Sequence, residues 1–353
     1  MPENRWRHVL PVLAFHATLS GVAPVAPARP FNIAAVVQRG RLGHEALLLA
    51  ASLRAADPGF QGRLLLAEPQ PGPLWPEDPR LPKGALRDRL EELGAEFVPF
   101  DSKVFGAAYA IGNKIEMLAA LPDEPFLFLD TDTLVTGPLS TLAPDFSRPS
   151  ASMKREDTWP VIELYGPGYA ETWAALYDRF GLDFAGSLDL SWPDEYWQRY
   201  MYFNAGWFLH DRPQDFGRRF LDYAVAIHKD RPAALVCQEL WPWLDQIALP
   251  LVIASFGGGR PGTDLAGLDG DLTLHYRTLP LLYATGSDRA VDVLESVAKE
   301  KENRRLLRDW EQAKQMVYQN RGRKARALFD QSDLPGREKV IRNTLKREGL
   351  WLR

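Results

Sequence analysis

The sequence predicts an α/β protein built around an open sheet, on three observations. Short apolar runs alternate with helix-spaced segments through the first half of the chain, the order that gives parallel strands joined by crossover helices. One run, residues 126–129, is apolar at every position, as expected of a strand buried on both faces. The 353-residue chain is 46% hydrophobic and 25% charged, a balance that supports a substantial folded core.

Each element of the first half is predicted from apolar spacing and from the residues that end it. The first helix, for example, repeats leucine and alanine at helical intervals and stops at Asp57-Pro58-Gly59, and the strand on either side of it makes a right-handed β-α-β unit. We expect strands at residues 31–38, 63–67, 97–100 and 126–129, and helices at 42–56, 85–93 and around 114–120.

The second half is richer in aromatic residues and less regular. Residues 169–180 place Tyr and Trp at helical spacing, while 202–209 sets Asn and Gly between strand-like apolar residues. We expect a further helix at 216–228, strands at 251–255 and 272–276, and a helical region from about Arg289 to the end.

Charge and cysteine content exclude several classes of protein. The net charge of −4 argues against a general nucleic-acid binder, so no nucleic-acid partner is expected, and Cys237 is the only cysteine, so no intrachain disulfide forms. The charge is uneven, because residues 299–353 carry +8 and the remainder −12. Such a basic tail either forms a solvated helical face or makes peripheral contact with an anionic membrane surface.

The N-terminal segment leaves two interpretations open. Arg5 and Arg7 precede an apolar stretch, and Ala26-Pro27-Ala28 resembles a cleavage site for a secretory leader. His16 and three prolines interrupt that stretch, however, and no segment is long and apolar enough for a transmembrane helix. We expect a cytoplasmic protein, either free or peripheral at the inner membrane face, with a cleaved leader as the alternative.

Asp130 and Asp132, separated by Thr131, directly follow the 126–129 strand. Side chains two residues apart on an extended segment point the same way, so the two carboxylates are expected to converge. They would repel unless a cation lay between them, and oxygen ligands favour Mg²⁺ or Mn²⁺, which keep positions open for substrate phosphate. Ligands of open α/β sheets bind at this edge. The alternative is a polar turn leading into Thr136-Gly137-Pro138.

Four motifs follow one another along the chain: Ser52-Leu53-Arg54, Phe128-Leu129-Asp130-Thr131-Asp132-Thr133-Leu134-Val135, Phe203-Asn204-Ala205-Gly206 and Asp245-Gln246. In this order they resemble those of GT-A glycosyltransferases, in particular the glycogenin-like and bacterial galactosyltransferase family (glycosyltransferase family 8). A late histidine, His275, also lies where that family places a metal ligand, and the resemblance covers roughly residues 31–280.

The resemblance implies a fold and a division of the chain. The fold would be α/β of GT-A type, a Rossmann-like mixed central sheet flanked by helices, with a helical C-terminal extension. Residues 1–285 would form the glycosyltransferase domain, with a nucleotide-binding half at about 31–140 and an acceptor half at about 141–285. Residues 286–353 would form the basic helical region.

The resemblance also implies a reaction and a donor site. The activity would be metal-dependent transfer of a sugar from a nucleotide-diphosphate sugar, most simply a UDP-sugar, with retention. Asp130, Asp132 and His275 would hold the metal, and the imidazole favours Mn²⁺ over Mg²⁺. Thr131 and Lys114 would lie at the donor diphosphate.

The remaining positions complete the expected site. The nucleotide base would lie near Gln38 and Arg39. Asn204 and Gly206 would form the acceptor wall, the amide bonding sugar hydroxyls and the glycine admitting a close backbone approach. Asp245 and Gln246 would lie on the acceptor side of the anomeric carbon as the catalytic pair, although their individual roles and the acceptor itself stay open.

This chain departs from the family pattern after His275. The family has a glycine and a Lys-Pro-Trp segment there, whereas Tyr276-Arg277-Thr278-Leu279-Pro280 follows here. Arg277 is therefore expected to replace the lysine that contacts the diphosphate.

Two other functions remain open from the residues alone. Asp130-Thr131-Asp132-Thr133 also fits the nucleophile loop of a haloacid-dehalogenase-like phosphatase, although that fold begins with this strand and has a downstream acidic pair, for which Asp269-Gly270-Asp271 is a weak candidate. A non-catalytic sugar-nucleotide-binding protein is the second alternative.

Overall fold

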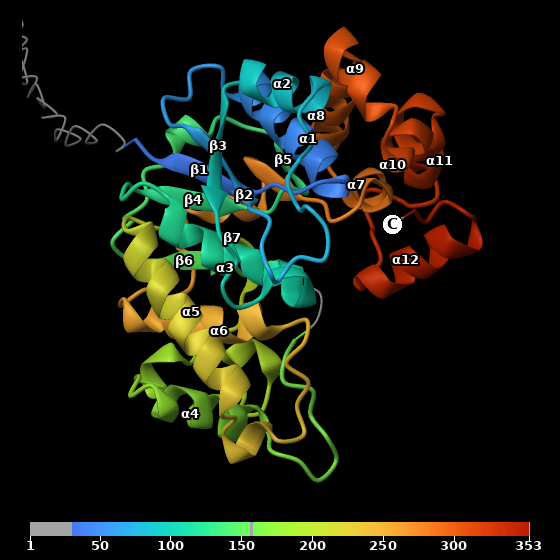
Figure 1. Ribbon diagram of the computed structural model, residues 1–353. Helices are drawn as coiled ribbons and strands as arrows, with labels where there is room; N and C mark the ends of the chain where they lie inside the picture. Colours follow the sequence, from blue (N-terminus) through green and yellow to red (C-terminus); the bar gives the residue numbers. More distant parts are fainter. Residues whose placement is uncertain (1–29, 156–157, 353) are drawn as a thin grey trace, which may run out of the picture.

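The protein folds around a six-stranded mixed sheet. The computed structural model describes residues 30–155 and 158–352 (Figure 1). The segment for which a leader was considered lies outside the described residues. The strands are β1 (Asn32–Val36), β2 (Leu64–Pro69), β3 (Ala95–Phe100), β4 (Phe126–Leu129), β5 (Thr133–Val135), β6 (Ser150–Ser152), β7 (Asn204–His210) and β8 (Thr273–His275).

Helices cover both faces of the sheet and form the C-terminal part of the chain (Figure 1). They are α1 (Arg41–Ala56), α2 (Ala85–Glu92), α3 (Asn113–Glu116), α4 (Tyr169–Arg179), α5 (Pro213–Lys229), α6 (Leu244–Ser255), α7 (Leu279–Thr285), α8 (Asp288–Lys299), α9 (Lys301–Leu307), α10 (Glu311–Ala313), α11 (Arg321–Arg326) and α12 (Glu338–Arg347).

The sheet has the strand order β3-β2-β1-β4-β7-β6. The first four of these strands are parallel, while β7 runs antiparallel to both β4 and β6. β5 and β8 form a separate antiparallel pair. The α/β class expected from the sequence is therefore confirmed, including a mixed central sheet flanked by helices and a helical C-terminal extension.

Alternate residues of the central strands face two different hydrophobic layers. Ile33 and Leu127 belong to the layer that includes α1 and α8, whereas Ala34, Phe126 and Phe128 belong to the layer of α5 and α6. Figure 1 shows these helices on opposite sides of the sheet. Burial on both faces explains why these strands read as continuous apolar runs.

The prediction of a strand at residues 251–255 is wrong, because these residues form the second half of α6. This helix is apolar almost throughout and nearly all of its residues are buried. A helix buried on all sides has no polar face, so its sequence lacks the 3.6-residue periodicity that separates a helix from a buried strand.

The C-terminal helices share a core with the sheet domain. Leu294 of α8 and Ile341 and Leu345 of α12 belong to the same hydrophobic layer as α1. The boundary expected at residues 285/286 stays a prediction, and the packing of apolar side chains is continuous across it. Among the described residues, no helix is long and apolar enough to cross a membrane.

Candidate active site

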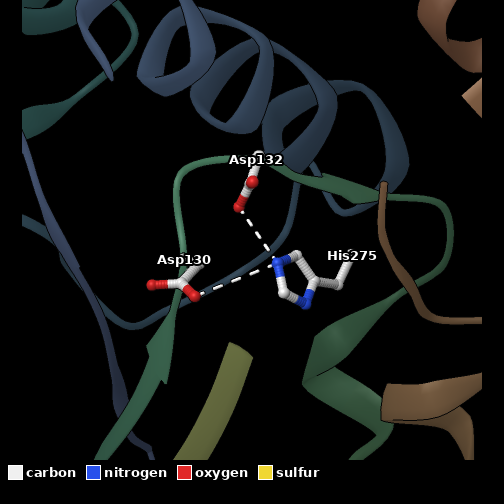
Figure 2. Close-up of side chains that lie close together, drawn as sticks. All are labelled: Asp130, Asp132 and His275. Atoms are coloured by element: carbon white, nitrogen blue, oxygen red, sulfur yellow. Dashed lines mark ion pairs between the residues drawn. The ribbon is translucent and has the colours of Figure 1, made fainter. Parts of the chain in front are cut away.

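Asp130 and Asp132 lie at the carboxyl end of β4, in the centre of the sheet. The residues between β4 and β5 form a turn rather than the extended segment expected. The backbone N–H of Asp130 donates to the carbonyl of Gly206 on β7, 2.9 Å away. The carboxylates still converge, because both point toward one imidazole (Figure 2).

That imidazole belongs to His275, the last residue of β8. Its Nε2 lies 3.1 Å from Oδ1 of Asp132 and 3.9 Å from Oδ2 of Asp130. The β5–β8 pair sets this position, since Thr133 and His275 are register partners and the N–H of Tyr276 donates to the carbonyl of Asp132. One ligand atom from each of the three side chains lies within 4.8 Å of the others.

The electrostatics of this cluster favour the charged forms of Asp132 and Lys114, whereas burial raises the pKa of Asp130. Burial alone would raise the pKa of Asp132, but the proximity of His275 and Arg41 holds it at about 2. Burial likewise acts to lower the pKa of Lys114, but the carboxylates of Asp130 and Asp245 outweigh it and the net shift is upward. Asp132 and Lys114 are therefore ionised at neutral pH.

Lys114, on α3, joins the aspartates to α6. Its Nζ lies 3.0 Å from Asp130 and 3.5 Å from Oδ2 of Asp245, and it donates to the carbonyl of Ala205 at 3.1 Å. The side chain is 8% exposed. A buried ammonium needs such partners, because an unpaired charge away from water is strongly destabilising.

Asp245 lies in the first turn of α6 and is almost completely buried. Its Oδ1 accepts a hydrogen bond from the hydroxyl of Tyr109 at 2.8 Å, and its backbone N–H donates to the same hydroxyl oxygen at 3.1 Å. The carboxylate thus faces Tyr109 and Lys114. Its neighbour Gln246 contributes to the wall of an open cavity.

This cavity has a volume of about 530 Å³, within the range typical of small-molecule sites. Residues from both halves of the chain line it. Those predicted from the sequence and found in its wall are Gln38, Lys114, Asp130, Thr131, Asp132, Asn204, Asp245, Gln246, His275 and Arg277.

Two predicted site residues do not line the cavity. Arg39 is exposed and forms an ion pair with Glu77 at 3.3 Å. Gly206 lies behind His275, where an added Cβ would come within 2.2 Å of the imidazole Nδ1. The close approach that this glycine permits is therefore that of His275, a residue of the chain itself.

A sequence model of the Rhodobacterales glycosyltransferase domain matches residues 33–257, which include all of β1 except its first residue, the aspartate pair and α6. The chain belongs to this glycosyltransferase family. Its expected nature as an enzyme that transfers sugars is thereby confirmed. No curated protein matches the sequence.

Several solved glycosyltransferases resemble this family member at low identity. The galactosyltransferase LgtC, in complex with donor and acceptor sugar analogues, is 15% identical over 78% of this chain and 99% of its own, with a TM-score of 0.44. The bifunctional WbbM is 14% identical over 79% and 51%, with a TM-score of 0.47. GlyE of Streptococcus pneumoniae TIGR4 is 15% identical over 81% and 65%, with a TM-score of 0.41.

The phosphatase alternative is not favoured for this glycosyltransferase. The candidate for its second acidic pair has a structural role, since the carboxylate of Asp269 accepts hydrogen bonds from Ser152, the Met153 backbone and the Trp207 indole. Asp269 is also absent from the wall of the cavity that holds Asp130.

Sequence reasoning missed two charged residues of α1 that line the cavity. Arg41 and Glu45 form an ion pair at 2.8 Å, and Oε2 of Glu45 accepts a hydrogen bond from the hydroxyl of Thr131 at 3.3 Å. Burial first, and then the charge of Asp132, raise the pKa of Glu45 to about 8 against the opposing effect of Arg41. Their i, i+4 spacing just after β1 is a signal that sequence reasoning could have used.

Other missed residues come from segments distant in sequence. Arg155 and Tyr202 line the cavity, and Arg342 reaches it from α12. Arg342 pairs with Glu338, which also pairs with Arg277. No sequence pattern indicated that the C-terminal helix would meet the site, because that contact depends on tertiary packing alone.

Proposed function

We propose that this glycosyltransferase uses a divalent metal to transfer a sugar from a nucleotide-diphosphate sugar, most simply a UDP-sugar, with retention of anomeric configuration. The observation that carries the proposal is the convergence of Asp130, Asp132 and His275 on one wall of an open cavity. Lys114 supplies a buried positive charge beside them. This combination suits a ligand that carries both a metal ion and phosphate groups.

The side chains present fit a divalent metal. Two carboxylates and one imidazole are a set that both Mn²⁺ and Mg²⁺ accept, with the nitrogen favouring Mn²⁺. When bound, the metal would act as a Lewis acid and neutralise charge that develops on the leaving diphosphate. Asp130, Asp132 and His275 would hold it, and Gly206 leaves the space that the imidazole occupies.

The donor would lie along the wall formed by β1, α1 and α3. Gln38, at the end of β1, would contact the base, and Thr131 and Lys114 would lie near the phosphates. Arg277 extends from the turn after β8, in the position where the sequence departs from the related transferases. A guanidinium there can form two parallel hydrogen bonds to a phosphate.

The acceptor would approach from the side of β7 and α6. The amide of Asn204 and the carboxamide of Gln246 line this side, and both can bond sugar hydroxyls. The Asp245 carboxylate is engaged by Tyr109 and Lys114. We therefore assign Asp245 a positioning role toward Lys114, and Gln246 the place beside the reacting carbon.

The division at residues 285/286, a cytoplasmic location and membrane contact through the basic tail remain part of the proposal. Exposed basic residues of the tail, such as Lys339 and Arg347 on α12, suit an anionic lipid surface. They are not needed for the chemistry described above.

The test replaces each metal-binding aspartate by its neutral isostere. Asp130→Asn and Asp132→Asn are expected to abolish transfer while the fold is retained, with Asp222→Asn, an exposed aspartate of α5, as control. Thermal shifts against UDP-, GDP- and CDP-sugars with Mn²⁺ identify the donor, since a ligand of the native state raises apparent stability. NMR of the product then gives its anomeric configuration. Full activity of the Asp130→Asn or the Asp132→Asn variant would contradict the metal role.

A further inference from the structure

A smaller groove of about 290 Å³ adjoins the acceptor side of the main cavity. Arg155 lies in the wall of both, so the two spaces meet at this side chain. A hydrogen bond joins them as well, because the side-chain amide of Asn204 in the wall of the main cavity donates to the backbone carbonyl of Lys154 in the wall of the groove, at 3.2 Å. A ligand that extends from the main cavity past Asn204 would therefore enter this groove.

Arg155 contributes a largely buried positive charge to the groove. Its guanidinium donates to the carbonyls of Tyr202 at 2.7 Å and Trp197 at 3.2 Å, and it lies 4.6 Å from the centre of the Trp197 ring. These carbonyls take two of the five N–H donors of a guanidinium. Within residues 30–155 and 158–352, no carboxylate lies within ion-pair distance of it.

Arg260 repeats this arrangement on the other side of the groove. It donates to the carbonyls of Ser187 at 2.7 Å and Arg199 at 2.9 Å, again without an ion-pair partner in the described parts of the chain. Burial lowers the pKa of Arg155 to about 10, and the nearby charge of Arg260 adds to the shift. Both guanidinium groups stay charged at neutral pH, so they repel each other without a bound anion.

The charge of the groove is not neutralised by its own acidic residue. Of the described lining residues, Lys154, Arg155 and Arg260 are basic and Asp189 is acidic. The Asp189 carboxylate closes a local turn, accepting hydrogen bonds from the N–H of Ser191 at 3.0 Å and from its hydroxyl at 2.6 Å. These lining residues thus leave a net charge of about +2 to be met by a ligand.

Two aromatic rings form a further part of the groove. Trp192 and Trp197 line it, and Trp192 is 37% exposed. Trp192 stacks on Tyr196 with ring centroids 5.0 Å apart, which holds the exposed indole in place. Rigid aromatic rings offer flat apolar surfaces that suit the faces of sugar rings, and cations between them add recognition of an anion.

We propose that this groove is an acceptor subsite for a glycan that carries an anionic group, a carboxylate or a phosphate, close to the hydroxyl that receives the sugar. The inference rests on the proposed function and specifies its acceptor class. Trp192 and Trp197 would contact the sugar rings. Lys154, Arg155 and Arg260 would bind the anionic group.

The first experiment compares matched acceptors without any donor. Binding of methyl β-glucoside, methyl β-glucuronide and methyl β-glucoside 6-phosphate is measured by saturation-transfer NMR on the full chain with Mn²⁺ and UDP. The charged probes are expected to bind at least about tenfold more tightly, because each charge-assisted hydrogen bond is stronger than a neutral one. The glucuronide and phosphate arms distinguish the two kinds of anion, and 0.5 M NaCl should reduce the preference.

Variants then test which residues carry the preference. Lys154→Gln alters an exposed side chain, and Arg260→Gln is paired with Arg260→Lys, which keeps the charge. Both glutamine variants should lose most of the preference for charged probes. Trp192→Ala, in contrast, should weaken the binding of neutral and charged probes to the same extent. Lys301→Gln on α9, which packs on α1 and α2, is the matched control and should change nothing.

Two results would overturn the subsite. One is equal binding of neutral and charged probes by the native protein. The other is an undiminished preference in a folded Lys154→Gln, Arg260→Gln double variant, with folding checked by circular dichroism. Because these binding measurements need no donor, charged probes that bind without transfer from any nucleotide sugar would support the subsite while contradicting the transferase reaction.

Discussion

The ammonium of Lys114 lies 3.5 Å from the carboxylate of Asp245, which ties α3 to the first turn of α6. The same ammonium lies 3.0 Å from Asp130. One buried cation therefore connects the aspartate pair after β4 with the first turn of α6 in the cavity wall. This relationship explains why an acidic residue of α6 is buried with its carboxylate turned toward the interior.

Replacing Lys114 should mainly affect stability, whereas replacing Asp245 should mainly affect activity. Lys114→Met is expected to lower the free energy of unfolding by about 3 kcal/mol, because the buried Asp245 carboxylate loses its cation. Asp245→Asn keeps the shape and the acceptor for the Tyr109 hydroxyl, so it should lower kcat about tenfold with a smaller loss of stability. Urea denaturation and steady-state kinetics measure the two effects.

The matched control for Lys114 is Lys103→Met. Lys103 is exposed and only its backbone N–H bonds to Glu116, so its replacement should change stability by less than about 0.5 kcal/mol. Equal urea midpoints for Lys114→Met and the native protein would show that the ion pair contributes no net stability.

Gly206→Ala should weaken metal binding without touching a proposed ligand. The new Cβ would lie 2.2 Å from Nδ1 of His275 and 3.0 Å from Oδ1 of Asn204, so the imidazole must move. Displacing a supporting contact of a metal ligand typically lowers affinity 10- to 100-fold. Mn²⁺ titration followed by EPR measures this, with Gly72→Ala, which meets no atom within 4 Å, as control. An unchanged Mn²⁺ affinity in Gly206→Ala would contradict the assignment of His275.

The order of strands and helices in the first half could be predicted because local signals agree there. Apolar runs are short, and Gly or Pro residues separate them from helices, as at Asp57-Pro58-Gly59. The strand predicted at residues 251–255 failed because α6 is buried on nearly all sides and contains Pro250. Because α6 has no polar face, only its length and its burial distinguish it from a buried strand, and neither can be read from a short stretch of sequence.

The resemblance to GT-A glycosyltransferases also indicated that Asp130, Asp132 and His275 would meet, whereas it did not reveal most of the surrounding wall. Arg155 reaches the cavity through contacts with the carbonyls of residues 197 and 202. Arg342 reaches it because α12 packs back on the domain. Such residues carry no local motif, so only the three-dimensional structure identifies them.

The stability of the metal-free protein should fall as pH rises toward 8, because of Glu45. Its side chain is 1% exposed and its folded pKa is raised to about 8 from an ordinary value of 4.5. Between these values the folded state binds more protons than the unfolded state, so stability declines with pH by up to about 1.4 kcal/mol per unit and levels off above pH 8.

The measurement is a thermal melt in EDTA between pH 6.5 and 8.5, compared with Glu45→Gln. The variant stays neutral, so its melting temperature should decline less across this range. Histidines with lowered pKa values, His44 and His210, change charge at lower pH and contribute little in this window. Parallel curves for the two proteins would show that Glu45 is not the group responsible.

Arg342→Met tests whether α12 contributes to the donor site. Glu338 forms ion pairs with both Arg277 and Arg342. One carboxylate neutralises only one of the two guanidinium charges, so the second positive charge can bind a phosphate. Methionine keeps the apolar stem, and Ile341 and Leu345 continue to hold the helix in the core. The variant should therefore fold normally, raise the KM for the donor about tenfold and leave kcat nearly unchanged. Arg347→Met on the same helix is the control, since Arg347 is 72% exposed and, among the residues that the structure describes, forms an ion pair only with its neighbour Glu348. Equal donor KM values for the Arg342 and Arg347 variants would exclude α12 from the site.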